Sequence, residues 1–291
     1  MEEAEKAGLI PELKTLVCKR DLSNAILCFE SLFAAFDARF NLIIHEDGTL
    51  DEYDIDVLLK RFSSAKVIRR AQGEVLVLEK LIKYPRCREY RIQYPMSNKL
   101  LDIPLLSSGS LSYVDSDVLF FRKIQTLFPA DGFPIFMYED DEGHSAPLLD
   151  LVYKYGLRIP AGFNAGIFRL DLAFHDLDRI EWFLGHPDLV CQAGLAEQTC
   201  YAMLSGEHSP RHFARDQFFC SKFRPIEITS QLVAVHFIYH LKAHIGKWHG
   251  QAMESIQNSQ AIDVLTFPAQ PLTITRIVKR RLMRPFMRLS S

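Results

Sequence analysis

The 291-residue sequence has no long apolar run and no close pair of cysteines. No run approaches the roughly 20 apolar residues that a membrane-spanning helix needs. The first thirty residues also lack the basic start, apolar centre and small-residue cleavage site of a signal peptide. The six cysteines are scattered, so we expect reduced, mostly packed thiols and no disulfide framework or zinc knuckle. These absences favour a cytoplasmic protein.

Acidic residues are missing after Asp263, where six cations follow. Because the whole chain has a formal net charge of −2, the first 263 residues carry −8. A body this acidic does not favour nucleic-acid binding. The basic segment 275–289 also contains many apolar side chains, so it suits either an anionic membrane surface or a cap packed on the acidic body. Pro285 would interrupt any helix in it.

Strand and helix patterns alternate three times before residue 90. Such alternation is typical of parallel βαβ units whose sheet is covered by helices on both faces. Ligands of these sheets bind at the carboxyl ends of the strands. The expected strands are 15–22, 40–48 and 65–70, and the expected helices are 22–36, 51–62 and 74–84.

The pattern becomes mixed after Asp117, and the chain contains no internal repeat and no low-complexity stretch. Two prolines in "FPAQP" (267–271) mark a boundary, so we predict one domain over 1–263 and a basic tail over 264–291. In this half we expect strands at 133–141, 165–172 and 232–237 and helices at 175–186 and 195–206.

The stretch "LSYVDSDVLFF" (111–121) places Asp115 and Asp117 one residue apart between two apolar runs. If the chain is nearly extended there, both carboxylates point to the same side. Such a pair makes a partial site for a divalent cation and leaves open positions for phosphate oxygens. The alternative is an ordinary strand-to-loop transition with solvated acids.

A second motif, "GFNAG" (162–166), combines two glycines and an alanine with one amide side chain. The small residues would let the backbone approach a ligand closely, and Asn164 can both donate and accept hydrogen bonds. The alternative is a glycine-rich turn that enters a strand.

Together with "AEQTCYAML" (196–204) and "VHFIYHLK" (235–242), these motifs resemble nucleotide-sugar glycosyltransferases of the GT-A fold. The resemblance is closest to family 8, the group of glycogenin and the bacterial lipooligosaccharide galactosyltransferases, and it spans residues 14 to 250. It implies an α/β fold with a Rossmann-like mixed central sheet and helices on both faces. The nucleotide-binding half would cover about 14–121 and the acceptor half about 122–263.

The resemblance implies a role for each matching residue. Asp115 and Asp117 would coordinate a Mn²⁺ or Mg²⁺ ion that bridges the donor's diphosphate, and His236 would be the third protein ligand. Lys242 would contact the phosphates directly. A metal ion and a lysine at this place would stabilise the charge that develops on the leaving nucleoside diphosphate.

Four further residues would contact the rest of the donor. Asn164 and Gln198 would line the sugar site, with Gln198 near the anomeric carbon. Asp47 would bind the base or ribose, and Lys99, which lies 16 residues before Asp115, would touch the donor sugar.

The chain departs from the family pattern in two places. The family's helix has the pattern D-Q-x-x-x-N, whereas this chain has Glu197 in place of the aspartate and no asparagine at the end. The family's last element ends K-P-W, whereas Lys242 is not followed by Pro-Trp. His236, His240 and His244 would form a transition-metal site if they shared a helix. The apolar run before His236 instead favours the end of a strand, and His236 as the ligand.

The stereochemistry of transfer stays open at this stage. The resemblance implies a retaining reaction, although an amide such as Gln198 is a poor nucleophile. An inverting enzyme needs a carboxylate base, which Glu139, Asp140 or Asp141 could supply.

We therefore predict a metal-dependent hexosyltransferase of polysaccharide biosynthesis that moves a sugar from a UDP-sugar to a glycan, lipid-linked or protein acceptor. The segment 275–289 would bring the enzyme to the inner face of the membrane. One alternative is a haloacid-dehalogenase-like phosphohydrolase with Asp115 as nucleophile and Asp117 as acid/base, although that family carries its motif near the chain start. Another is a catalytically silent sugar-nucleotide-binding protein.

Overall fold

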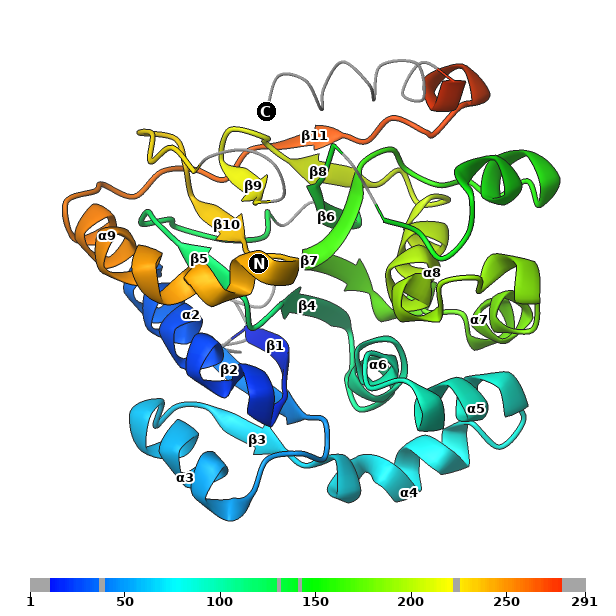
Figure 1. Ribbon diagram of the computed structural model, residues 1–291, viewed down its shortest axis with the longest axis horizontal. Coiled ribbons are helices and arrows are strands. Elements are labelled where there is room, and N and C mark those ends of the chain that lie inside the picture. Colours follow the sequence, from blue (N-terminus) through cyan, green and yellow to red (C-terminus); the bar gives the residue numbers. More distant parts are fainter. Residues whose placement is uncertain (1–10, 37–39, 130–131, 141–142, 222–225, 279–291) are drawn as a thin grey trace.

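The computed structural model describes residues 11–36, 40–129, 132–140, 143–221 and 226–278. These residues form an α/β fold with an eight-stranded mixed sheet and a smaller three-stranded sheet (Figure 1). The strand order is β11-β8-β6-β7-β4-β1-β2-β3 in the large sheet and β5-β10-β9 in the small one. The predicted fold class is confirmed.

The strands of the first half are parallel, and the second half adds antiparallel neighbours. β1 pairs in parallel with both β2 and β4, whereas β7 runs antiparallel between β4 and β6. The strands are β1 (Glu12–Val17), β2 (Asn41–Glu46), β3 (Lys66–Ile68), β4 (Ser110–Val114), β5 (Val118–Phe120), β6 (Ile135–Tyr138), β7 (Phe163–Asp171), β8 (Arg211–Phe213), β9 (Phe218–Cys220), β10 (Ala234–His236) and β11 (Thr266–Pro268).

Helices cover both faces of the large sheet (Figure 1). One apolar cluster contains buried side chains of α2 and α3, another contains those of α5, α7 and α8, and a third contains Ile245 and Ala252 of α9. The α-helices are α2 (Leu22–Ala35), α3 (Glu52–Arg61), α4 (Arg70–Lys80), α5 (Pro85–Gln93), α6 (Ile103–Leu105), α7 (Leu177–Leu184), α8 (Ala196–Ser205) and α9 (Ile245–Gln257). None of the helices in the described part of the chain is long and apolar enough to cross a membrane.

The periodic segments of the sequence form the predicted elements with shifted ends. The helix expected at 22–36 is α2, whose buried side chains include Ala25, Phe29 and Leu32, at steps of four and three. The first strand ends at Val17, earlier than expected, because a 3₁₀ helix follows it.

Several short elements have no counterpart in the sequence prediction. Strands β8, β9 and β11 contain three residues each, too few to show an alternating pattern. Helix α9 was also missed, although its Ala252 and Ile256 lie one turn apart and are buried.

Part of the predicted basic tail joins the fold. β11 pairs with β8 at the edge of the large sheet, and Leu272 and Ile277 are buried in the same apolar cluster as α8. Residues 279–291, which include most of the proposed membrane-binding segment, lie outside the described residues.

Candidate active site

Asp115 and Asp117 lie in the turn that joins β4 to β5. β4 and β5, on the two sides of this turn, belong to different sheets. The Val118 amide donates to the Asp115 carbonyl (3.3 Å), and this turn, not an extended chain, brings the two carboxylates together. Because β1, β2 and β4 are parallel, the turn lies at the carboxyl edge of the sheet.

Asp115, Asp117 and His236 each offer one ligand atom, and these atoms all lie within 4.8 Å of one another. His236 is the last residue of β10, as predicted, and its Nε2 is 3.1 Å from Asp117 Oδ1 and 3.6 Å from Asp115 Oδ2. Ligands about 2.1 Å from an octahedral ion lie about 3 to 4 Å apart. The donor set therefore fits Mn²⁺ or Mg²⁺.

The His236 ring is oriented by Asn164. His236 Nδ1 lies 3.0 Å from Asn164 Oδ1, and Asn164 donates from Nδ2 to Glu139 (2.9 Å). Because an amide oxygen only accepts, Nδ1 is the donor, and Nε2 faces the carboxylates as a metal ligand would. A Cβ on Gly166 would lie 2.2 Å from His236 Nδ1, so the space that the GFNAG glycines provide is occupied by protein rings.

Lys242 contacts the Asp117 carboxylate at a different oxygen from the one nearest His236. Its Nζ is 2.7 Å from Asp117 Oδ2 and 3.4 Å from Asp21 Oδ2, and a third of the side chain is exposed. Burial acts to raise the pKa of Asp117, but His236 and Lys242 outweigh it and hold that pKa well below its usual range. The ammonium group is thus charged and accessible beside the candidate metal ligands.

Lys99 lies in a short π-helix, Asn98–Asp102, and is buried. Its Nζ contacts both Asp115 carboxylate oxygens (3.1 Å each), the Ala165 carbonyl (2.9 Å) and Glu197 (3.4 Å). Burial acts to lower the pKa of Lys99, but Asp115 and Glu197 outweigh it, so the pKa is raised. Lys99 is therefore a charged partner of Asp115.

Glu197 completes this buried network from the first turn of α8. Burial, and to a smaller extent the nearby Asp115 charge, raise its pKa to about 7, although Lys99 opposes the shift. The next residue, Gln198, is held at both ends of its amide. It donates to the Gly143 carbonyl (2.6 Å) and accepts from the Ala165 amide (3.3 Å).

Asp47 lies just beyond the end of β2, at the same edge of the sheet. Its carboxylate accepts hydrogen bonds from the amide (3.1 Å) and hydroxyl (2.6 Å) of Thr49. Among the described residues, no hydrogen bond or ion pair joins the Asp47 side chain to the metal-ligand group.

His240 and His244 lie in a 3₁₀ helix, Tyr239–His244, and not on one α-helical face with His236. Neither belongs to the metal-ligand group found in the described part of the chain. Of the candidate bases, Glu139 is buried against Asn164, Asp140 is ion-paired with Arg215, and Asp141 lies outside the described residues.

Sequence reasoning missed two residues that touch this network. The Tyr113 hydroxyl donates to Asp115 Oδ1 (2.9 Å), and it lies two residues before Asp115 on β4, which is a local signal that the motif contained. The second is Asp21, the residue before α2, whose side chain forms no cap bond to that helix and whose carboxylate faces Lys242.

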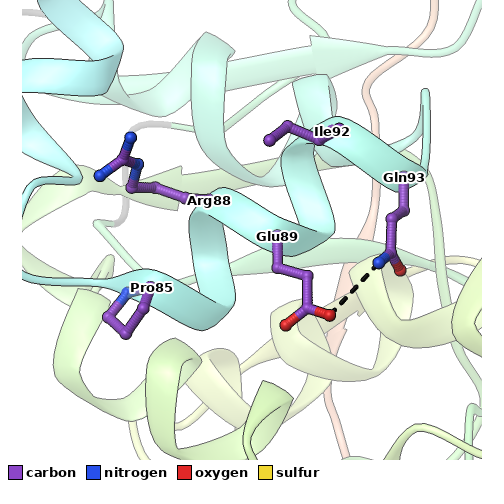
Figure 2. A pocket seen from close by; sticks show the side chains of 5 residues that line it. All are labelled: Pro85, Arg88, Glu89, Ile92 and Gln93. Atoms are coloured by element: carbon purple, nitrogen blue, oxygen red, sulfur yellow. Dashed lines mark hydrogen bonds between the residues drawn. The ribbon is translucent and has the colours of Figure 1, made fainter.

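A separate surface pocket lies along the exposed face of α5 (Figure 2). It is lined by Pro85, Arg88, Glu89, Ile92 and Gln93, and Glu89 accepts a 3.3 Å hydrogen bond from Gln93. None of these residues belongs to the network around Asp115.

The sequence matches no protein-family model and no curated protein. The structure, however, resembles the galactosyltransferase LgtC solved with donor and acceptor sugar analogs, with a TM-score of 0.51 and 13% identity over 86% of this chain and 97% of that one. The chain has the GT-A fold. An active-site mutant of LgtC matches this GT-A chain equally well, with the same score, identity and coverage.

A weaker likeness links the chain to core-mannan synthase A from Aspergillus fumigatus in a form with Mn and GDP. Its TM-score is 0.40, with 12% identity over 69% of this chain and 72% of that one. The predicted resemblance to GT-A proteins is confirmed at the level of the fold.

Proposed function

We propose that the protein is a metal-dependent glycosyltransferase that moves a hexose from a UDP-sugar to a glycan, glycolipid or protein acceptor. The observation that carries the proposal is the group Asp115, Asp117 and His236 with Lys242 beside it, at the carboxyl edge of a GT-A sheet. A Mn²⁺ or Mg²⁺ ion bound there would offset the charge of the donor's diphosphate and of the departing nucleoside diphosphate.

The residues around the ion would divide the work of holding the donor. Lys242, which is a third exposed, can reach a phosphate oxygen while Asp117 turns to the metal. Asp47, at the neighbouring strand end, would bind the base or ribose. Gln198 would lie near the anomeric carbon, held there by the Gly143 and Ala165 backbone.

Asn164 and Lys99 would act on the donor site through their neighbours. Asn164 fixes the His236 ring, and Lys99 fixes Asp115. The Lys99 ammonium has three hydrogens and three partners, so a contact with the donor sugar requires it to give up Asp115, Ala165 or Glu197.

We propose retention of anomeric configuration. The two candidate bases for inversion that the structure describes already have partners, Glu139 with Asn164 and Asp140 with Arg215. A covalent intermediate on Gln198 is not part of the proposal, because an amide is a poor nucleophile.

The segment 275–289 would bind the inner face of the membrane and so bring the enzyme to its acceptor. Within the described part of this segment Ile277 is buried, so attachment would fall to the cations and apolar residues that follow it. This localisation rests on the sequence pattern.

Asp117→Asn tests the proposal directly. With Mn²⁺, the wild-type protein should hydrolyse at least one member of a UDP-hexose panel, and the variant should lose 100-fold or more of that rate because it loses a metal ligand. Asp56→Asn, an exposed change on α3, is the control and should retain full activity.

Two other results would contradict the proposal. Metal-dependent UDP binding without any hydrolysis or transfer would indicate a silent binding protein. Release of phosphate from small phosphomonoesters would favour the phosphohydrolase.

A further inference from the structure

Tyr239 has an unusual backbone conformation at the edge of the candidate site. Its φ of 54° lies in the left-handed region that side chains other than glycine rarely adopt. Among the non-glycine residues that the structure describes, only Ser209 shares it. Such strain persists where the surrounding structure holds the residue in place, and it is found most often at functional sites.

Tyr239 lies between two residues of the candidate site in the sequence and near a third in space. It lies three residues after the metal-ligand candidate His236 and three before Lys242, whose Nζ contacts Asp117. Its hydroxyl reaches towards Gly143, since a Cβ on that glycine would lie 3.9 Å from the Tyr239 oxygen. The Gly143 carbonyl in turn accepts the hydrogen bond from Gln198.

Tyr239 is also open to solvent, unlike the candidate metal ligands Asp117 and His236. The residue is 59% exposed, whereas Asp117 and His236 are 5% and 6% exposed. A ligand that meets the phenol ring must therefore approach from the solvent side of the metal-ligand group.

We infer that Tyr239 is a specificity-determining residue that stacks against the acceptor sugar. The inference rests on the proposed function. A tyrosine ring offers an apolar face to the C–H face of a pyranose and a hydroxyl to its polar edge. The donor's phosphates belong at the buried carboxylates and its base near Asp47, at the end of β2, so the exposed rim between Tyr239 and Gly143 is left for the second substrate.

Saturation-transfer NMR with methyl glycosides of galactose, glucose and mannose tests this inference, with UDP and diamagnetic Mg²⁺ present. Saturation should pass to at least one glycoside in the wild-type protein and in Tyr239→Phe, which keeps the ring. It should fall about tenfold in Tyr239→Gly, a change that also relieves the strained φ and so is not expected to unfold the chain. Tyr153→Ala, at an exposed tyrosine outside the site, is the control.

The affinity for UDP, measured by calorimetry, separates the outcomes. It should differ by less than twofold between the wild-type protein and the Tyr239 variants. A tenfold weaker affinity in Tyr239→Gly would mean that the ring contacts the donor, and would overturn the inference. So would unchanged saturation transfer in that variant, or no transfer to any glycoside in a wild-type protein that binds UDP. Failure of the wild-type protein to bind UDP would instead overturn the proposed function.

Discussion

The ring of His236 is fixed by contacts on two of its sides. Asn164 accepts a hydrogen bond from Nδ1, and Gly166 leaves the space that the ring fills. Both residues belong to β7, which is antiparallel to β4, the strand that leads to Asp115. β7 therefore supports the His236 ring and also pairs with the strand that leads to Asp115.

Gly166→Ala should weaken Mn²⁺ binding by tenfold or more, because the added Cβ would lie 2.2 Å from His236 Nδ1 and displace the ring. The same crowding should lower the free energy of unfolding by about 1–3 kcal/mol. Mn²⁺ titration and urea unfolding measure the two effects. Gly250→Ala, on α9 with no atom within 4 Å of the new Cβ, is the control. Unchanged Mn²⁺ affinity in Gly166→Ala would refute this account of the ring.

The charged residues of the candidate site could be identified from the sequence more easily than the residues that contact and orient them. Asp115, Asp117, His236 and Lys242 stand in short motifs at strand ends, and the fold brings those motifs together. The contact between Asp21 and Lys242 joins residues 221 positions apart, and no local spacing encodes such a contact.

At the scale of elements, helix α5 begins without a cap of its own. Its N-cap residue Tyr84 forms no side-chain hydrogen bond to the helix. Glu181 on α7 supplies the missing acceptors, because its carboxylate accepts from the amides of Arg86 and Cys87 (2.9 Å each). The start of one helix is thus capped by the side chain of another.

Glu181→Ala should lower the free energy of unfolding by about 1–2 kcal/mol, because two amides of α5 lose their acceptor. Glu181→Gln, which keeps one acceptor oxygen, should lose less. Urea unfolding is the measurement. Glu89→Ala removes an exposed carboxylate from α5 itself and should change stability by less than about 0.5 kcal/mol. Equal losses in Glu181→Ala and Glu89→Ala would show that the cap contributes nothing.

Elements were predictable from the sequence where a periodic pattern was long enough. Helix α2 and strand β2 follow such patterns, whereas the pattern after β4 was too short to predict the three-residue strand β5 that follows Asp117. The turn between them depends on pairing with β7 and β10, which lie far along the chain.

At the scale of the whole molecule, the alternation of strands and helices before residue 90 was enough to predict a parallel sheet covered on both faces. The order of the later strands was not predictable, because β8 and β11 are held by contacts such as that of Arg211 with Thr266. The boundary predicted at 264 stays a prediction, and the chain beyond it contributes β11, Leu272 and Ile277 to the fold.

Two truncated chains separate the packed and basic parts of this segment. A chain ending at 263 should lose several kcal/mol of unfolding free energy, because burying a leucine or isoleucine side chain contributes about 1.5–3 kcal/mol. A chain ending at 278 should unfold like the full chain but lose binding to phosphatidylglycerol vesicles, with phosphatidylcholine vesicles as the control. Full stability of the chain ending at 263 would contradict the stabilising role of residues 264–278. Unchanged vesicle binding of the chain ending at 278 would contradict the membrane-binding role of residues 279–291.

The central claim is that Asp115, Asp117 and His236 hold a divalent metal ion for a nucleoside diphosphate. Titration of Mn²⁺, followed by the electron paramagnetic resonance signal of the free ion, measures this most directly. The wild-type protein should bind one Mn²⁺ per chain, more tightly with UDP present, and Asp117→Asn should lose this binding while Asp56→Asn retains it. Equal Mn²⁺ binding by Asp117→Asn and the wild-type protein, or no effect of UDP on it, would contradict the account.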